Sequence, residues 1–179
     1  HGGEKKGRHV VTEALRGKSR ALMSEAGTPV ISDPGYLLVR EALKKGIEVQ
    51  CLPGATALIP ALVQSGLPAD RFIFEGFLPP KKGRQTRLKL WSEETRTIVF
   101  YESPHRIIRT LKAMREIFGN DHLVFIAREL TKIFETYYRG KLGELIDEIE
   151  NNKDNQKGEF VLIVSALKKE TQQEKKHSK

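Results

Sequence analysis

A polar loop, which we call the first loop, gives the first indication of the fold: Ser24-Glu25-Ala26-Gly27-Thr28-Pro29-Val30-Ile31-Ser32-Asp33-Pro34-Gly35. It follows a short apolar run in residues 20–24, expected to be a strand, and precedes a helical apolar repeat in residues 36–45. In an α/β protein such a loop lies at the carboxyl edge of the sheet, where ligands usually bind. Glycines, prolines and small polar side chains suit a backbone folded closely around a small molecule. From these residues alone, a ligand-binding loop and an ordinary strand-to-helix connection are both open.

A second loop of the same kind, Pro53-Gly54-Ala55-Thr56-Ala57, follows an alternating run in residues 47–52 that is expected to be a strand. If the two strands are neighbours, both loops lie at one edge of the sheet and can share one ligand. Neither loop has the G-x-G-x-x-G or G-x-x-x-x-G-K-[ST] pattern of a phosphate-binding loop. Asp33 is expected to cap the helix after the first loop, with Pro34 in its first position.

Length and composition indicate a globular protein with a substantial core: 179 residues, 39% hydrophobic and 30% charged. No apolar run approaches the ~20 residues of a membrane span, and the first residues lack the apolar core of a signal peptide. We therefore expect a cytoplasmic protein without a membrane partner. Cys51, the one cysteine, is expected to be a buried structural thiol. His9, His122 and His177 lack ligand spacing and are expected at the surface, so we expect no metal site.

The formal net charge of +8 is unevenly distributed. Residues 81–89 contain five basic and no acidic residues, and a helix carrying Arg106, Arg109, Lys112 and Arg115 follows. A basic stripe favours a polyanionic partner such as RNA, and a solvated surface is the other interpretation. The candidates for RNA contact are Lys81, Lys82, Arg84, Arg87, His105 and Arg106.

Beyond residue 67 the periodicity predicts a second domain that alternates strands and helices. Strands are expected at residues 71–78, 97–101, 123–127, 134–138 and 158–165. Helices are expected at residues 81–92, 104–118 and 142–149, the second of them capped by Ser103 with Pro104 in first position. The expected domains are residues 1–67 and 68–167, followed by a disordered basic tail, residues 168–179.

Seven motifs resemble, in order, those of one known family: S-E-A-G-T-P-V-I-S-D-P-G-Y, L-P-G-A-T-A, S-G-L-P, F-E-G-F-L-P, F-Y-E-S-P-H-R, A-R-E-L-T-K and G-E-F-V-L-I-V. On these motifs the sequence is identified as a member of the ribosomal small subunit methyltransferase I family, in the tetrapyrrole methylase superfamily. Glu25 stands where the family usually has Asp, and Val30 where it has Gly, so we expect no positive φ at Val30. The family's first strand, a P-T-P-I-G-N-like loop and an E-D-T-R-like segment are absent from this sequence, so the first domain is expected to be truncated at its N-terminus.

The resemblance implies a two-domain α/β fold of the class III methyltransferases, with S-adenosylmethionine as the cofactor. It implies 2′-O-methylation of a cytidine in the decoding region of 16S ribosomal RNA, usually by a homodimer. It places the first loop along the methionine end of the cofactor and the second loop beside the adenosine. The implied cofactor contacts are Ser24, Glu25, Ala26, Gly27, Thr28, Pro29, Ser32, Asp33, Pro53, Gly54, Ala55 and Thr56.

Three residues after the expected strand 123–127 are candidates for the chemistry: Arg128, Glu129 and Lys132. A 2′-hydroxyl is a poor nucleophile near neutral pH, so a base or a cation that stabilises the developing alkoxide would assist. Glu129 could take the proton, and Arg128 or Lys132 could hold phosphate or stabilise the oxyanion. A structural ion pair at a strand end is the other explanation. Two further hypotheses are open: a non-catalytic RNA-binding or dimerising fragment, and a relative that methylates a tetrapyrrole-like small molecule.

Overall fold

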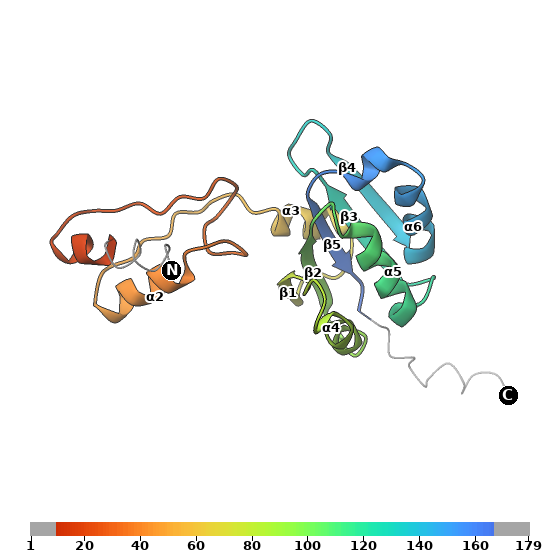
Figure 1. The fold of residues 1–179 in the computed structure, drawn as a ribbon, viewed down its shortest axis with the longest axis horizontal. Coiled ribbons are helices and arrows are strands. Elements are labelled where there is room, and N and C mark those ends of the chain that lie inside the picture. The colour runs from red at the N-terminus through yellow and green to blue at the C-terminus, as the bar shows by residue number, and fades with distance from the viewer. Residues whose placement is uncertain (1–9, 167–179) are drawn as a thin grey trace. The chain divides into compact units, whose positions relative to one another are not determined.

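A mixed five-stranded sheet organises the chain from residue 57 onward in the computed structural model, which describes residues 10–166 (Figure 1). Its spatial order is β1-β2-β5-β3-β4. β1 and β2 are parallel, β5 lies antiparallel between β2 and β3, and β4 is antiparallel to β3. The strands are β1 (Phe72–Phe77), β2 (Thr97–Glu102), β3 (Leu123–Arg128), β4 (Thr136–Lys141) and β5 (Phe160–Val164). The predicted α/β class and the five predicted strands of this half are confirmed, with β4 shifted toward the C-terminus.

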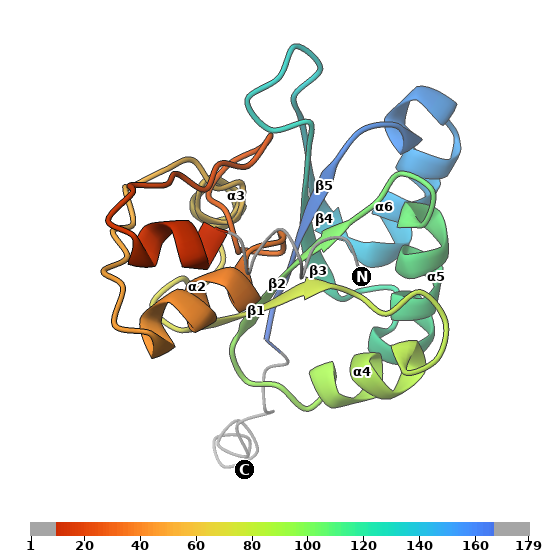
Figure 2. The same cartoon turned by 60° about the vertical axis from the view of Figure 1, so that its left-hand side comes forward.

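The side chains of β5 alternate between the two faces of the sheet. Phe160, Leu162 and Val164 belong to one apolar cluster, whereas Val161 and Ile163 belong to the other. Figure 2 shows α4, α5 and α6 on one side of the sheet and α3 on the other. Because both faces are covered, all of β5 is buried. The helices are α3 (Leu58–Ser65), α4 (Arg84–Trp91), α5 (Ile107–Phe118) and α6 (Leu142–Glu150), with a short 3₁₀ helix, η1 (Lys153–Gln156), before β5.

Residues 10–56 contain no strand and belong to a unit separate from the sheet. Residues 10–15 are helical, and α2 (Tyr36–Lys44) follows the first loop. The strands expected at residues 20–24 and 47–52 are not formed, and most of these residues are exposed. A strand needs a neighbour that bonds its N–H and C=O groups, and neither segment has one within residues 10–56. For the same reason Cys51, expected to be buried, is exposed.

The two capping predictions are wrong. α2 begins after Gly35, whose φ is +134°, and no side chain caps it, so Asp33 is not the cap and Pro34 is not helical. α5 begins after Arg106 and also lacks a side-chain cap. The Ser103 carbonyl accepts bonds from the amides three and four residues later, at 3.0 and 3.1 Å. A tight turn therefore occupies the residues that were expected to form the first helical turn.

The chain divides into two compact units between residues 56 and 57, because α3 packs on the sheet through Ala61 and Leu62. The expected domains 1–67 and 68–167 stay a prediction, and the tail 168–179 lies outside the described residues.

His122, expected at the surface, is buried, with Nε2 3.0 Å from the Ser165 carbonyl oxygen. Within residues 10–166, no helix combines the length and apolar character needed to cross a membrane.

Candidate functional site

The first and second loops lie against each other. The Thr28 amide donates to the Ala55 carbonyl oxygen at 2.8 Å, and Thr28 Oγ1 donates to the same oxygen at 3.1 Å. Two glycines allow this approach: a Cβ on Gly27 would lie 2.8 Å from the Ala55 oxygen, and one on Gly54 would lie 3.0 Å from Thr28 Oγ1. The structure therefore brings together the two segments expected to share a ligand, even though neither follows a strand.

The backbone of the first loop forms a turn over residues 29–32. Val30 has a φ of +78° and Ser32 one of +56°, so the expectation that Val30 needs no positive φ is wrong. A β-branched residue is strained in this left-handed region. The conformation brings the Val30 side chain against Gly35, where a Cβ would lie 3.1 Å from Val30 Cγ2 and 2.9 Å from Leu22 Cδ2. Close packing against Gly35 and Leu22 thus accompanies a left-handed conformation that valine disfavours and glycine would adopt readily.

Glu129 follows β3 and is held in a left-handed conformation, with a φ of +51°. Its amide donates to the Glu159 carbonyl oxygen at 2.9 Å, and its Oε1 accepts from the Glu159 amide at 2.7 Å. That hydrogen bond, assisted by Lys132, lowers the pKa of Glu129, so its carboxylate stays ionised. Gly158 leaves the room for it, because a Cβ there would lie 2.5 Å from Glu129 Cγ. Oε2 has no hydrogen-bond partner among residues 10–166.

Lys132 lies between two carboxylates. Its Nζ is 2.9 Å from Glu159 Oε2 and 3.1 Å from Glu129 Oε1. Both partners, Glu159 first, raise the pKa of Lys132, so the side chain stays a cation and cannot serve as a base. It can still donate a hydrogen bond to a developing negative charge, because an ammonium carries three donors.

Arg128 is buried and bonds mostly to the chain's own carbonyl oxygens. Nε donates to Lys157 at 2.6 Å, Nη2 to Asp154 at 2.8 Å and Nη1 to Phe134 at 3.2 Å. Nη1 also lies 3.4 Å from the Thr136 hydroxyl. These bonds occupy most of the guanidinium, so the arginine ties the residues around η1 to the start of β4.

The candidate catalytic residues and several basic candidates reach the same edge of the sheet. β1, β2 and β3 point the same way, and β5 runs opposite to β2 and β3. Glu102 at the end of β2 and Arg128 at the end of β3 both pair with Phe160 at the start of β5. The segments after β1, β2 and β3 therefore leave the sheet at the edge where Glu129 lies.

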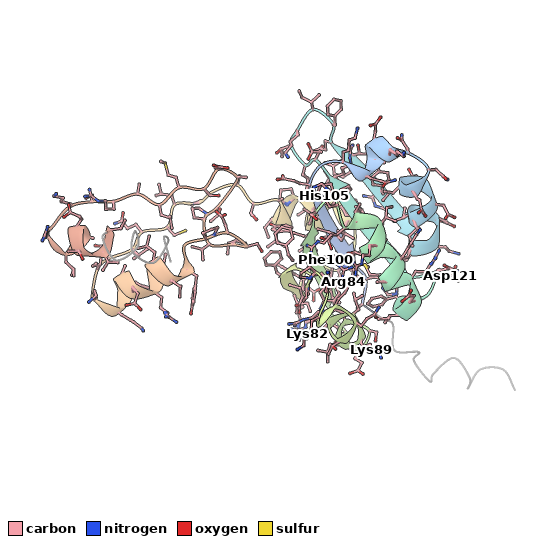
Figure 3. The ribbon with its side chains drawn as sticks, viewed as in Figure 1. Lys82, Arg84, Lys89, Phe100, His105 and Asp121 are labelled. Atoms are coloured by element: carbon pink, nitrogen blue, oxygen red, sulfur yellow. The ribbon has the colours of Figure 1, made fainter. Side chains whose placement is uncertain are left out.

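Three of the six candidates for RNA contact, Lys81, Arg84 and His105, line a hollow of about 590 Å³ between the N-terminal side of α4 and α5. Figure 3 labels Arg84 on α4 and His105 just before α5. Arg109 and Lys112 also line it, although they were noted only as part of the basic stripe. Arg109 and Lys112 are three residues apart on α5, so they lie on one helical face, and this spacing predicts that both line the same surface.

The other three candidates lie outside the hollow. Lys82 is exposed, and Arg87 forms an ion pair with Glu75 at 3.3 Å. Arg106 binds Glu102 Oε1 at 2.7 Å and the Leu78 carbonyl oxygen at 3.0 Å. Arg106 thus has a structural role at the sheet edge that the sequence did not reveal. Across the described part of the chain, no group of three or more His, Cys, Asp and Glu side chains could hold a metal ion.

Comparison with known proteins identifies the family of this chain. Residues 2–146 match the model of the Tetrapyrrole (Corrin/Porphyrin) Methylases. A Thermotoga maritima protein named Ribosomal RNA small subunit methyltransferase I is 46% identical over 162 residues, which cover 90% of this chain and 72% of that protein. A protein of the same name from Xylella fastidiosa is 51% identical over 156 residues, 87% of this chain and 57% of that protein.

The chain belongs to the ribosomal RNA small subunit methyltransferase I group of the tetrapyrrole methylase family. This member spans less than two thirds of the length of its Xylella fastidiosa relative. Its fold is also similar to the crystal structure of uroporphyrin-III C-methyl transferase from Thermus thermophilus complexed with S-adenyl homocysteine. The two share a TM-score of 0.58 and 17% sequence identity, over 90% of this chain and 70% of that one. The family fold predicted from the seven motifs is therefore confirmed.

Proposed function

We propose that this family member is an S-adenosylmethionine-dependent methyltransferase acting on the 2′-hydroxyl of a cytidine in the decoding region of 16S ribosomal RNA. The observation that carries the proposal is the contact between the first and second loops, through Thr28 and Ala55. The names of its relatives and the S-adenyl homocysteine in the Thermus thermophilus structure support it. Its proposed setting is the cytoplasm, as a homodimer that takes the small ribosomal subunit as substrate.

The residue types and the exposure of the two loops suit the binding of the proposed cofactor. Residues 25–27 and 53–55 are small or polar apart from Pro53 and are exposed, so their backbone groups are accessible to a ligand. The close approach at Gly27 and Gly54 holds the two loops together. When bound, the cofactor supplies a methyl group activated by a positively charged sulfur. The loops hold and orient it, since an in-line transfer depends mainly on alignment.

Glu129 and Lys132 are proposed to act on the acceptor hydroxyl. Glu129 Oε2, which lacks a partner among the described residues, would accept the hydrogen bond of the 2′-hydroxyl and then its proton as the methyl group is transferred. Lys132 would stabilise the developing negative charge on that oxygen through its remaining N–H. Arg128 is proposed as a positioning residue rather than a ligand of phosphate, because its donors bond to backbone oxygens.

Calorimetry with S-adenosylmethionine on this chain tests the cofactor role. A clear heat of binding in the micromolar range is expected from the wild type, and at least a tenfold weaker affinity from Gly27→Ala, because its Cβ would meet the Ala55 oxygen. Gly17→Ala is the matched control: Gly17 has a φ of +77° against +79° for Gly27, with no atom within 4 Å of the added Cβ. No heat from the wild-type chain would overturn the proposed cofactor role.

Methyl transfer to small ribosomal subunits tests the acceptor and the chemistry. Glu129→Gln is expected to lower the rate roughly a hundredfold or more, in the range of general acid–base contributions, with little change in cofactor affinity. Methylation that persists at the wild-type rate in this variant would rule out the role given to Glu129. A product modified on a base, rather than on a ribose, would contradict the proposed acceptor.

RNA binding without methyl transfer is a second candidate function. The observation that favours it is that the basic candidates and the cofactor loops lie in different parts of the chain. Every basic candidate belongs to the unit that starts at residue 57, whereas the first loop and residues 53–56 of the second loop come before residue 57. RNA binding that persists without any heat from S-adenosylmethionine would favour this candidate over the enzyme.

A further inference from the structure

A buried guanidinium whose two Nη atoms have no partner among residues 10–166 forms part of the wall of the basic hollow. Arg84 is only 4% exposed, and its Nε donates to the Pro79 carbonyl oxygen at 3.1 Å. Both Nη atoms are buried, and neither has a hydrogen-bond partner in the described structure. Unsatisfied donors on a buried cation are among the most unfavourable groups a folded protein can hold. A ligand that accepts hydrogen bonds would remove this penalty.

Within residues 10–166, no carboxylate forms an ion pair with this guanidinium. The nearby Glu102 is fully engaged: Oε1 bonds Arg106 at 2.7 Å and the Ser103 amide at 2.8 Å, and Oε2 accepts from Thr110 at 2.7 Å. Burial lowers the pKa of Arg84, and the positive charges of Arg109 and Arg106 lower it further, against a smaller opposing effect of Glu102. The site is therefore electropositive as well as deficient in hydrogen-bond acceptors.

Most of the charged residues in the rest of the lining are basic. Lys81, His105 and Arg109 line the hollow, and none of the three has a side-chain ion pair or hydrogen bond within residues 10–166. Lys112 is paired with Glu150 at 2.5 Å. Glu116 is the one acidic side chain among the lining residues. Cations thus outnumber carboxylates around a cavity of about 590 Å³, which is large enough for a phosphate group together with its ester substituents.

We propose that this hollow binds a phosphate group, with Arg84 at its base and His105 and Arg109 at its rim. The planar fork of a guanidinium matches two oxygens of a phosphate, and charge-assisted bonds of this kind are the strongest hydrogen bonds in proteins. The occupant is a phosphodiester of a single-stranded RNA backbone. That assignment of the occupant rests on the proposed function, whereas the phosphate site itself rests on the geometry alone.

The position of the hollow favours RNA as the source of the phosphate. His105 follows β2, Lys81 and Arg84 follow β1, and these segments leave the sheet at the edge where Glu129 lies. A backbone phosphate bound here would fix the RNA strand at the same edge as the groups proposed to act on its ribose. An RNA strand also fits the net charge of +8, because each neutralised phosphate releases counterions.

The test compares Arg84→Met with Lys89→Met on the full chain. Lys89 lies on the same helix, is exposed and is not among the residues lining the hollow, so its loss removes the same charge elsewhere. Single-stranded RNA oligonucleotides are titrated at several salt concentrations. Arg84→Met is expected to weaken binding by roughly tenfold to a hundredfold, and to reduce the salt slope by about one. Lys89→Met is expected to weaken it by about twofold or less.

A second measurement separates a lost site from a misfolded protein. Inorganic phosphate should raise the melting temperature of the wild type and of Lys89→Met, but not of Arg84→Met. Arg109→Ala removes an exposed rim residue and should weaken both RNA and phosphate binding without lowering the melting temperature of the free protein. Equal RNA binding by Arg84→Met and Lys89→Met, with no stabilisation by phosphate, would overturn the proposal.

The remaining outcomes separate the occupant from the proposed function. Tighter binding to vesicles of anionic phospholipid than to RNA, lost in Arg84→Met, would overturn RNA as the occupant. RNA binding that is lost in Arg84→Met, by a wild-type chain that gives no heat with S-adenosylmethionine, would refute the proposed function and support the phosphate site. Cofactor binding by Arg84→Met at wild-type affinity is expected, because both loops belong to other segments of the chain.

Discussion

Replacing Gly158 with alanine should displace Glu129 and destabilise the sheet edge. The added Cβ would lie 2.5 Å from Glu129 Cγ and 2.6 Å from Oε1, so the carboxylate must move and lose its bond from the Glu159 amide. A hydrogen bond to a charged group contributes about 1.5–3 kcal/mol. The φ of +96° adds about 1–2 kcal/mol of strain for a residue with a Cβ. The free energy of unfolding should therefore fall by roughly 2.5–5 kcal/mol, measured by urea denaturation.

Two controls isolate the displacement of Glu129 from the backbone strain. Gly119 has a φ of +84°, and no atom lies within 4 Å of a Cβ built on it, so Gly119→Ala should cost only the strain. In the Glu129→Ala background the collision is absent, and Gly158→Ala should then cost about as much as Gly119→Ala. Equal destabilisation by the two single glycine substitutions, or an undiminished cost in the Glu129→Ala background, would refute the reasoning.

Three further predictions concern other parts of the chain. Val30→Gly removes left-handed strain of about 1–2 kcal/mol, so hydrogen exchange of the first-loop amides should slow, whereas Val30→Ala should leave it unchanged or faster. His122 has a pKa lowered by burial, so the folded protein binds fewer protons there than the unfolded chain. Its contribution is complete above the ordinary histidine pKa and is lost as pH falls below about 6.5; urea denaturation at several pH values should show this slope, and His122→Gln should flatten it. Arg139 donates from Nε to the Ser65 carbonyl oxygen at 3.4 Å and lies over the Phe125 ring at 5.0 Å. Arg139→Met keeps the packing and loses the donors, so calorimetry should show a stability loss of about 1 kcal/mol; no loss would mean that this contact does not hold α3 to the sheet.

The five strands of the sheet were predictable from the sequence because each carries its own signal and finds its partners within the chain. β5, for example, is an apolar run buried on both faces. The runs at residues 20–24 and 47–52 carry a similar signal but form no strand. Strand formation depends on a neighbour as well as on residue type, and a pattern read along one segment does not report whether the neighbour exists.

Parts of the candidate site were predictable, and the reasons for the failures are local. The two loops were expected at one sheet edge because each follows an expected strand, and they are in contact although those strands are not formed. The left-handed conformation of Val30 depends on packing against Gly35, which no local preference contains. Arg84 was predicted as a surface RNA contact from the charge of its neighbours, and the structure buries its side chain. Its spacing from Leu88 and Trp91, four and seven residues, places all three on one face of α4, and this spacing predicts that the Arg84 side chain is buried with them.

The central position of β5 has a consequence for how the protein is made. β5 is the last strand among residues 10–166, yet it lies between β2 and β3, and Val164 pairs with Ile98, far earlier in the chain. During synthesis β2 and β3 must therefore each keep one edge unpaired until β5 leaves the ribosome. Pairings of this sequence separation are slow to form, and open apolar edges promote aggregation. The sheet is thus expected to close only after β5 has been translated, and until then two apolar strand edges stay exposed to aggregation.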